Sequence, residues 1–336
     1  MNNKKYVLGV DGGNTKTDFF LFKVDGAFVD FIRVGTCSHE ALPDSFEGAK
    51  RELGKGIESL LSKNNIKKEE LAFSVFGLAG CDIPLQHDSL VKAVTEIGLK
   101  DFIIANDSFL GIKAVSESGV CSICGTGTAA GGIGLDGKTL QVGGIGSICG
   151  DEAGGSWLAR RAVKATFDAA YRFGKPSYIE KIVYDELAVN DKYYLMEAIS
   201  LKLFTRKVDL TRITKEVFNG ANLGDEVCIE MLKEMANNLA RSASGCIVNL
   251  KLKEKPLVIM IGSVFVKGAC PVLVDEFKRL VNYYTKKDCE FVMLTVPPAT
   301  GAIIWAIEEA TKAYPDKSIK EKIIKEVKDN LERLEK

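Results

Sequence analysis

The sequence predicts an α/β protein of two similar lobes, and two observations carry this prediction. Short apolar strands alternate with helix-like segments, which is typical of a mostly parallel sheet with sites at the carboxyl ends of its strands. The spacing from Thr17 to Asp25-Gly26 recurs from Thr128 to Asp136-Gly137. Each copy follows a Gly/Thr turn and ends in an Asp-Gly hairpin turn. We interpret the two copies as one structural pattern used twice.

Length and composition indicate a globular protein with two cores. The chain has 336 residues, whereas single cores stop growing at about 250–300 residues. Apolar residues make up 46% and charged residues 27%, and 45 basic residues balance 45 acidic ones. No net charge therefore recruits nucleic acid or a membrane surface. No stretch approaches the roughly 20 apolar residues of a spanning helix, and we expect a cytoplasmic protein without nucleic-acid or membrane partners.

The elements of the first lobe are predicted from residue 7 onward. Strands are expected over 7–10, 19–24, 28–34, 71–80 and 101–107, and helices over 44–63 and 85–97. The second strand leads through Asp25-Gly26 into the third as a tight hairpin. Residues 1–115 are expected to form this N-terminal lobe.

The second lobe is expected over residues 116–312. It begins near residue 120 with a strand, a Gly/Thr turn, a strand, an Asp-Gly turn and another strand, and it continues as a largely helical segment. Its later elements are a strand within 256–268 that ends in Gly-Ser, a helix over 271–284, a strand over 289–296, and a loop over 297–302 that enters a helix over 301–312.

The tail, residues 313–336, reads as an amphipathic terminal helix. It begins with Ser318-Ile-Lys-Glu, a capping-box pattern, and its later apolar residues form one stripe. Such a stripe either docks on its own chain or forms an oligomer contact. We expect a homodimer.

The nine cysteines do not predict a disulfide framework, because they are odd in number and scattered over a large chain. The one close pair, Cys121 and Cys124, lies in a segment that reads as a buried strand. Residues three apart in a strand point to opposite faces, so we interpret the pair as buried thiols rather than a metal or redox site. With only His39 and His87 in the chain, a His-rich metal site is excluded.

The stretch from Val7 to Phe22 joins two strands through Asp-Gly-Gly-Asn-Thr-Lys-Thr, and glycines beside a lysine and threonines indicate a phosphate site. A Walker loop is excluded because Lys16 follows threonine rather than glycine, and a strand rather than a helix comes next. The run from Gly125 to Ala130 fits the loose dinucleotide pattern. It also leads into a strand, however, and no acidic residue follows about 20 positions later.

What remains is a phosphate held by two hairpin turns, one from each lobe. Glycine turns let backbone N–H groups approach an anion, and threonine hydroxyls add donors. Asp11 lies at the end of the first strand, beside the first turn. A carboxylate there suits a hydrated Mg²⁺ that bridges the phosphates, so we expect Asp11 to hold the metal through water.

The order of six motifs resembles the N-acetylglucosamine kinase and BadF-type ATPase branch of the actin-like superfamily. The motifs are DGGNTKT, IIANDS, CGTGTAAGGIG, GGIGSICGDEAGGSWLARRAV, VIMIGSVF and PPATGA, and they span about residues 5–310. The resemblance implies two ribonuclease H-like lobes that close on a cleft holding Mg·ATP and a small amino-sugar substrate.

Site residues follow from the same resemblance. It assigns nucleotide contacts to both turns and to two later pairs: Asp11, Gly12, Gly13, Asn14, Thr15, Lys16, Thr17, Gly125, Thr126, Gly127, Thr128, Gly262, Ser263, Gly301 and Ala302. It assigns sugar contacts to Ser38, His39, Asp107, Thr126, Gly127, Ile145, Gly146 and Asp151.

Asp107 matches the family's catalytic base. Phosphoryl transfer to a sugar hydroxyl requires an acceptor for the hydroxyl proton, and an aspartate at the carboxyl end of a buried strand can accept it. The alternative is a helix N-cap, because Asn106-Asp107-Ser108 precedes helix-like sequence. The same alternative holds for Asp151 in Gly-Asp-Glu.

Two departures from the family lie where the acetamido side of the sugar should be. Ser38 stands at the position of the Asn in the family's Thr-Asn-His, and Ile145 stands at the Trp of Gly-Gly-Trp-Gly. Replacing Trp by Ile145 opens space and removes a flat apolar wall. A bulkier amino sugar such as N-acetylmuramic acid is therefore a further hypothesis.

The expected function is an ATP-dependent kinase that phosphorylates the 6-hydroxyl of an amino sugar. One alternative is an ATPase that activates a dehydratase or reductase through an iron–sulfur cluster shared by two subunits, which Cys121 and Cys124 serve poorly. A non-catalytic sugar sensor is another. It is disfavoured because the chain keeps Asp107 and shows no separate helix-turn-helix module.

Overall fold

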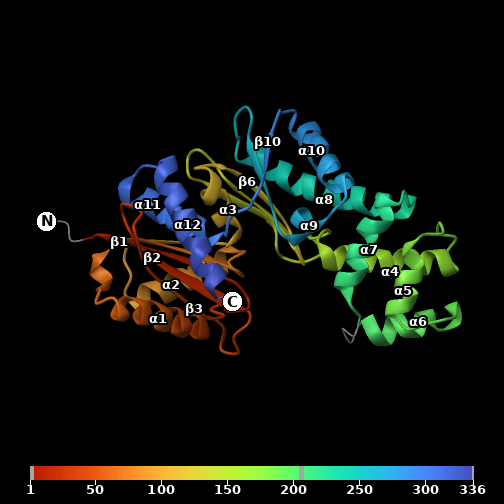
Figure 1. Ribbon diagram of the computed structural model, residues 1–336, viewed down its shortest axis with the longest axis horizontal. Helices are drawn as coiled ribbons and strands as arrows, with labels where there is room; N and C mark the ends of the chain where they lie inside the picture. Colours follow the sequence, from red (N-terminus) through yellow and green to blue (C-terminus); the bar gives the residue numbers. More distant parts are fainter. Residues whose placement is uncertain (1–3, 204–207, 335–336) are drawn as a thin grey trace. The chain divides into compact units, whose positions relative to one another are not determined.

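The computed structural model describes residues 4–203 and 208–334, which form two compact units (Figure 1). The first unit contains the described residues up to 118 and those from 294 onward, and the second contains residues 119–293. The predicted boundary near residue 115 lies close to the observed one. The predicted assignment of residues 294–312 to the second lobe is wrong, because the chain returns there to the first unit.

The first unit is built on a five-stranded sheet in the order β3-β2-β1-β4-β5. The strands are β1 (Tyr6–Gly12), β2 (Lys16–Lys23), β3 (Phe28–Gly35), β4 (Leu71–Leu78) and β5 (Phe102–Ala105). The first three pair antiparallel through short turns, while β4 and β5 join parallel to β1. The sheet is therefore mixed rather than mostly parallel, because hairpins make half of its pairings.

The second unit repeats this topology. Its strands are β6 (Gly119–Cys124), β7 (Thr128–Ile133), β8 (Thr139–Gly143), β9 (Leu257–Ile261) and β10 (Glu290–Met293). Their order, β10-β9-β6-β7-β8, is the same as that of the first sheet when counted from the opposite edge. The predicted duplication of one α/β pattern is confirmed.

The Asp-Gly turns of the two sheets also match in detail. The Asp25 carboxylate accepts the Ala27 N–H at 3.0 Å, and the Asp136 carboxylate accepts the Lys138 N–H at 3.2 Å. Gly26 has φ 84° and Gly137 has φ 77°. Both positions need the left-handed backbone that glycine adopts without strain, which explains the recurrence of Asp-Gly at this spacing.

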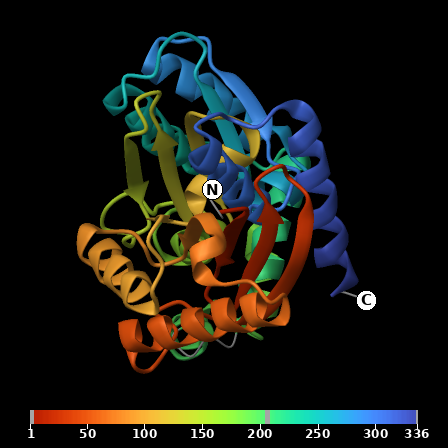
Figure 2. The same ribbon diagram turned by 90° about the vertical axis from the view of Figure 1, so that its left-hand side faces the viewer.

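Helices cover both faces of the first sheet (Figure 2). On one face lie α1 (Ser45–Lys63) and α2 (Pro84–Ile97), and Phe19 of the sheet packs against Gly56 of α1. On the other face lie α3 (Ser108–Val115) and α11 (Ala299–Thr311), where Gly9 leaves room for Ile303. The short helix η1 (Lys68–Glu70) precedes β4.

Helices α3 and α11 approach closely. A Cβ added to Gly301 would lie 1.8 Å from the Leu110 carbonyl oxygen, so only glycine fits at this crossing. The buried Lys113 ammonium pairs with Glu308 at 2.6 Å and ties the same helices together. Gly301 and Ala302 were predicted to end a loop, but they lie inside α11, which begins at Ala299.

The second unit carries the long helical segment. Its helices are α4 (Gly155–Tyr171), α5 (Ile179–Glu186), η2 (Lys192–Tyr194), α6 (Leu195–Ala198), η3 (Ile199–Leu203), α7 (Leu210–Asn222), α8 (Glu226–Asn249), α9 (Ser263–Lys267) and α10 (Pro271–Thr285). Helix α8 packs against β6, β7, β8 and α10 and supplies much of the buried core. Residues 204–207 of the predicted helical segment lie outside the described residues.

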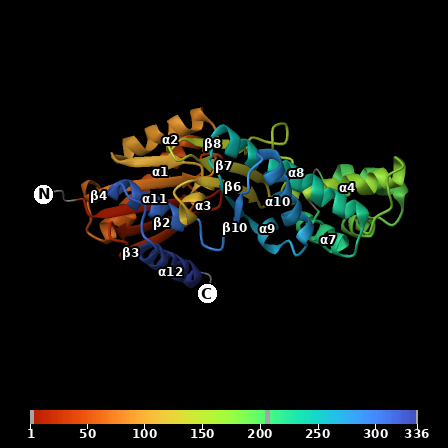
Figure 3. The ribbon, with the colours of Figure 1, turned by 90° about the horizontal axis from the view of Figure 1, so that it is seen from above.

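The terminal helix α12 (Lys317–Arg333) docks on its own unit beside α11 and β3 (Figure 3). Ile323 and Val327 of the predicted apolar stripe are buried there. Of the two alternatives for this stripe, docking on its own chain is the one observed. The predicted cap at Ser318 is wrong, because the Asp316 carboxylate accepts the Ile319 N–H at 2.9 Å and begins the helix earlier.

Among the described residues the nine cysteines form no disulfide, and all but Cys149 are buried. Cys121 and Cys124 lie in β6, as predicted for buried thiols. Within the residues that the structure describes, no helix combines the length and apolar character needed to cross a membrane.

The repeated turns give a stability prediction. Gly26→Ala and Gly137→Ala should each cost about 1–2 kcal/mol of unfolding free energy, because alanine is strained in left-handed backbone. A Cβ at Gly137 would meet no atom within 4 Å, so no steric cost adds to the backbone strain there. A Cβ at Gly26, in contrast, would lie 2.8 Å from Ile319 Cγ2. Gly26→Ala should therefore lower the thermal midpoint further, and Ile319→Ala should remove that excess. If Gly26→Ala lowers the thermal midpoint equally in the wild type and in the Ile319→Ala variant, α12 does not contact this turn as described.

Candidate active site

Acidic side chains gather at one edge of the first sheet. Asp11 lies near the carboxyl end of β1, and in the parallel register it stands beside Gly77 of β4, which in turn stands beside Ala105 of β5. Asp107 follows β5 by two residues, and Asp82 lies in the segment after β4. Because the carboxyl ends of parallel strands meet at one edge, the fold brings together acids that are about a hundred residues apart.

Asp107 precedes α3 but does not cap it. Its side chain makes no capping hydrogen bond, and the Asn106 Oδ1 atom accepts the Ser108 N–H at 2.9 Å instead. The Asn106 Nδ2 group donates to Asp82 Oδ1 at 2.9 Å, so the buried amide has partners at both ends. The Asp107 side chain therefore makes no capping hydrogen bond, although the Ser108 N–H lies close enough to lower the pKa of its carboxyl.

The electrostatic setting of Asp107 favours proton uptake. Burial raises the pKa of its carboxyl from 3.8 to about 6, and the negative charge of Asp82 adds to the rise. A carboxylate with such a pKa is a stronger proton acceptor than an exposed aspartate, while most of it is still ionised at pH 7. These properties are those required of a general base.

The pKa of Asp11 is raised further than that of Asp107. Burial raises its pKa to about 7, with further rises from the charges of Asp107 and Asp18, while Lys16 and the Ala299 N–H at the start of α11 oppose them. Asp18 itself is buried and forms a bidentate ion pair with Arg33, at 2.6 and 2.8 Å. The edge of the sheet thus holds more negative charge than its own cations compensate.

This uncompensated charge fits a divalent cation that arrives with a nucleotide. Among the described residues, no group of three or more His, Cys, Asp or Glu side chains could hold a metal by itself. A cation held through water by Asp11, with phosphate oxygens as its other ligands, is consistent with this set of donors.

The first Gly/Thr turn presents three exposed residues, Asn14, Thr15 and Lys16. The Gly13 N–H donates to the Lys16 carbonyl at 2.9 Å and closes the turn. The Thr36 hydroxyl donates to the Gly13 carbonyl at 3.0 Å and ties the turn to the segment after β3. Gly12 is buried against Leu78 and serves packing. The accessible part of the predicted phosphate turn is therefore its tip.

The two threonines that end the predicted turns have structural roles. Thr17 is fully buried, and its hydroxyl accepts the Cys37 N–H at 3.0 Å. The Thr128 hydroxyl donates to the Ile123 carbonyl at 2.8 Å and closes the second hairpin. The buried Thr17 hydroxyl is therefore out of reach of a phosphate, whereas contact of Thr128 with a phosphate stays a prediction.

Hydrogen bonds from the start of α4 fix one side of the second turn. The Gly155 and Ser156 N–H groups of α4 donate to the Gly125 and Thr126 carbonyls at 2.8 and 3.0 Å. A Cβ on Gly154 would lie 2.7 Å from the Gly127 carbonyl oxygen. In contrast, a Cβ on Gly125 or on Gly127 would meet no atom within 4 Å. One side of the turn is therefore packed and the other is open.

Two adjoining cavities lie next to this turn. One, of about 110 Å³, is lined by Gly125, Thr126, Thr214 and Ser263, among others. The larger, of about 430 Å³, shares Thr214 and Ser263 with it and extends between α7 and α9. Gly262, with φ 107°, packs against Cys124 and allows α9 to start beside the turn. Of these two predicted residues, Ser263 lines both cavities beside the second turn, and Gly262 packs behind it.

Sequence reasoning missed most of the lining of the larger cavity. These residues are Thr211, Thr214, Lys215, Phe218, Asn219, Val264, Lys267, Gly268 and Ala269. The only signal was the amphipathic pattern of α7, which predicts a buried face but not a binding surface. Gly301 and Ala302, which were assigned to the nucleotide, are buried against α3 and β1 in the first unit.

The predicted sugar residues after β3 are mostly enclosed. Ser38 and His39 are buried, and the imidazole stacks on Phe46 with ring centroids 4.2 Å apart. Burial lowers the pKa of His39 below its ordinary value. Its Nδ1 atom is buried without a hydrogen-bond partner among the described residues. Of the two side chains, His39 therefore retains an unused polar atom that a ligand could satisfy.

The loop before α4 is organised by Asp151. Its carboxylate accepts the N–H groups of Gly144 and Gly146 at 2.7 and 2.5 Å. Ile145, between them, is 60% exposed. Asp151 does not cap α4, whose N-cap is Gly154. Contact of Asp151, Ile145 and Gly146 with a sugar stays a prediction.

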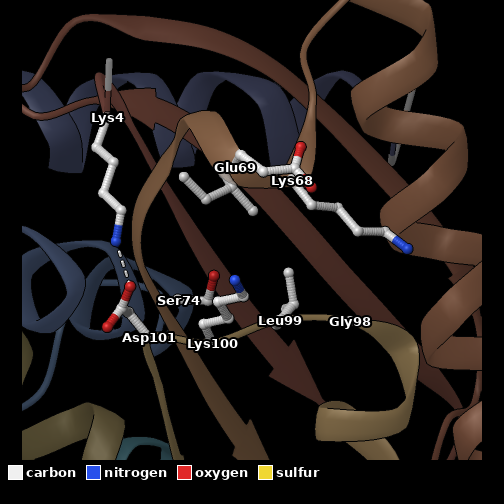
Figure 4. Close-up of a pocket in the computed structure, with 9 residues that line it drawn as sticks. Lys4, Lys68, Glu69, Ser74, Gly98, Leu99, Lys100 and Asp101 are labelled. Atoms are coloured by element: carbon white, nitrogen blue, oxygen red, sulfur yellow. Dashed lines mark hydrogen bonds and ion pairs between the residues drawn. The ribbon is translucent and has the colours of Figure 1, made fainter. Parts of the chain in front are cut away.

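A separate cavity lies at the opposite edge of the first sheet (Figure 4). It measures about 220 Å³ and is lined by Lys4, Lys68, Ser74 and Asp101, among others, and Lys4 pairs with Asp101. These residues precede or begin the strands whose carboxyl ends carry Asp11 and Asp107. The cavity is not part of the candidate site.

Comparison with known proteins identifies the family. Residues 8–306 match the model of the BadF/BadG/BcrA/BcrD ATPase family. The chain belongs to this family. An N-acetylmuramic acid/N-acetylglucosamine kinase of Clostridium acetobutylicum is 25% identical over 319 aligned residues. The alignment covers 91% of this chain and 99% of the relative. An N-acetyl-D-glucosamine kinase of Dictyostelium discoideum is 24% identical, and the alignment covers 91% of this chain and 98% of that relative.

Solved structures share the fold. A protein from Chromobacterium violaceum assigned as an N-acetylglucosamine kinase superimposes with a TM-score of 0.62 at 19% identity, over 90% of this chain and 99% of that one. A hexokinase of the ROK family from Thermus thermophilus gives a TM-score of 0.53 at 17% identity, over 92% and 98%. The predicted actin-like fold of duplicated α/β units is confirmed.

The raised pKa of Asp107 gives a prediction for the ligand-free protein. Between pH 4 and 6 the folded state binds more protons at this group than the unfolded state, so its contribution to stability falls as the pH rises through this window. Asp107→Asn should therefore raise the thermal midpoint more at pH 8 than at pH 4.5, with an upper bound of about 3 kcal/mol at pH 8 and about 1 kcal/mol at pH 4.5. Asp185→Asn, at an exposed aspartate of α5, is the matched control substitution. A destabilised Asp107→Asn protein at pH 8 would contradict the buried charge.

Proposed function

We propose that the protein is an ATP-dependent kinase that transfers a phosphoryl group to the 6-hydroxyl of an amino sugar, N-acetylglucosamine or N-acetylmuramic acid or both. The observation that carries the proposal is the uncapped Asp107, with its raised pKa, at the strand edge that also holds Asp11. The two relatives named as kinases of these sugars support the substrate class.

In this proposal Asp107 is the general base. As the γ-phosphorus bonds to the sugar oxygen, the bond to the β-phosphate oxygen breaks, ADP leaves, and the hydroxyl proton passes to the Asp107 carboxylate. The 6-hydroxyl is the primary alcohol of the ring and projects from it, so it can reach a partly buried acceptor.

The other residues bind and position the nucleotide. The open sides of the two glycine turns offer backbone N–H groups, and Lys16 adds a cation at the first tip. The cavity between α7 and α9, which adjoins the second turn, has the size of a small-molecule site and suits the nucleoside. Mg²⁺, held through water by Asp11, would neutralise charge on the phosphate oxygens.

The activator alternative is not favoured. It needs cysteines that project together at a subunit interface, whereas Cys121 and Cys124 are fully buried within one strand. A cytoplasmic location and a homodimer stay predictions, and light scattering of the purified protein would measure its mass in solution.

The deciding experiment is ATP consumption by the pure protein with N-acetylglucosamine, N-acetylmuramic acid, glucosamine, glucose or no sugar. Sugar-dependent turnover is expected with the acetylated amino sugars. Asp107→Asn should lower kcat by about 10²–10⁴-fold with little change in the KM for ATP, because it removes the proton acceptor alone. A slow ATPase activity without sugar dependence would contradict the kinase.

The position of transfer is tested separately. The 6-deoxy analogue of an accepted sugar should inhibit competitively without being phosphorylated, because it lacks the reacting oxygen but keeps the other contacts. Phosphorylation of this analogue at another hydroxyl would refute the 6-hydroxyl assignment while leaving the kinase intact.

A further inference from the structure

A polar cavity lies between α8 and the loop that contains Asp151, within the second unit. It measures about 400 Å³, which is within the usual range for small-molecule sites. The loop contributes Ile148, Gly150 and Glu152, and Val142 of β8 adds an apolar surface. From α8 come Asn238, Arg241 and Ser242.

The face of α8 that lines this cavity is fixed against the loop. Asn238, Arg241, Ser242 and Gly245 are spaced so that they share one side of the helix. The Asn238 amide donates to the Glu152 carbonyl at 2.8 Å, and a Cβ on Gly150 would lie 3.9 Å from the Ser242 hydroxyl. Arg241 is therefore presented to the same loop that carries the predicted sugar ligand Asp151.

The Arg241 guanidinium has no ion pair or hydrogen bond among the described residues. Glu152 lines the same cavity without pairing with it. By contrast, Arg161 of α4 is paired with Glu234 of α8 at 2.5 Å. The cavity thus offers a free guanidinium, whose planar fork matches a carboxylate, and a carboxylate that can accept sugar hydroxyls. A sugar that carries an acid group offers a carboxylate to the guanidinium of Arg241 and hydroxyls to the carboxylate of Glu152.

Building on the amino-sugar kinase proposed above, we propose that Arg241 binds the lactyl carboxylate of N-acetylmuramic acid and makes this sugar a substrate. N-Acetylmuramic acid differs from N-acetylglucosamine by an ether-linked lactyl group at the 3-oxygen, so a carboxylate is the group that distinguishes the two. The lactyl methyl group meets an apolar surface in Val142 and Ile148. N-Acetylglucosamine has no anion and does not use Arg241.

The test is steady-state kinetics of the full-length enzyme with both sugars at saturating Mg·ATP. Arg241→Met keeps an unbranched apolar stem and removes the charge and donors of the side chain. It should lower kcat/KM for N-acetylmuramic acid on the order of 10- to 100-fold, through KM, and leave N-acetylglucosamine within about twofold. Arg241→Lys should recover part of the loss. Arg279→Met, which removes an exposed arginine of α10, should change neither sugar.

A second measurement removes the charge from the ligand. The methyl ester of N-acetylmuramic acid should be a poorer substrate than the acid for the wild type, by the same factor as the arginine replacement, and should not distinguish wild type from Arg241→Met. Equal losses on both sugars, or unchanged turnover of N-acetylmuramic acid, would overturn the role of Arg241. Wild-type turnover of N-acetylglucosamine alone would also overturn it and leave the kinase standing. No sugar-dependent turnover at all would overturn both.

Discussion

The hydrogen bonds of the Asn106 amide are the interaction on which the candidate site depends. A carboxylate at the start of a helix ordinarily accepts the first free N–H groups, and that bond lowers its pKa. Here Asn106 accepts the Ser108 N–H and is held in turn by Asp82. The Asp107 side chain thereby makes no capping hydrogen bond, and burial raises the pKa of its carboxyl more than the nearby Ser108 N–H lowers it. Without this arrangement the same aspartate would be a structural cap and a weak base.

The duplicated fold gives the two units different tasks. In the hydrogen-bonded register, Gly12 pairs with Thr17 and Cys124 pairs with Thr128, so Asp11 in the first sheet corresponds to Ile123 in the second. The cluster of Asp11, Asp82 and Asp107 therefore belongs to the first sheet, and the second sheet has an apolar residue at the position of Asp11. In the proposed function, one copy of the backbone pattern supplies the catalytic acids and the other supplies a turn beside two cavities.

Local chemistry made much of this predictable from sequence. The strands, both Asp-Gly turns and the matched spacing follow from local propensity, and Asp107 stands out because an acid ends a buried strand. Longer-range packing was not predictable. The sequence does not show that Thr17 is buried against the segment after β3. It also does not show that the backbone of Leu110 in α3 lies so close to Gly301 in α11 that no side chain fits there. The sequence left open whether Asp107 caps α3, and only the folded structure shows that the Ser108 N–H donates to Asn106, which is held by Asp82.

The most direct test of this account is a carbon-13 NMR titration of the Asp107 carboxyl in the ligand-free protein, with the resonance assigned by its loss in Asp107→Asn. We predict a midpoint near pH 6, because burial and the charge of Asp82 raise the pKa more than the neighbouring N–H groups lower it. A midpoint at or below the ordinary value of 3.8 would mean that the carboxylate is capped or solvated. That result would contradict its role as the proton acceptor.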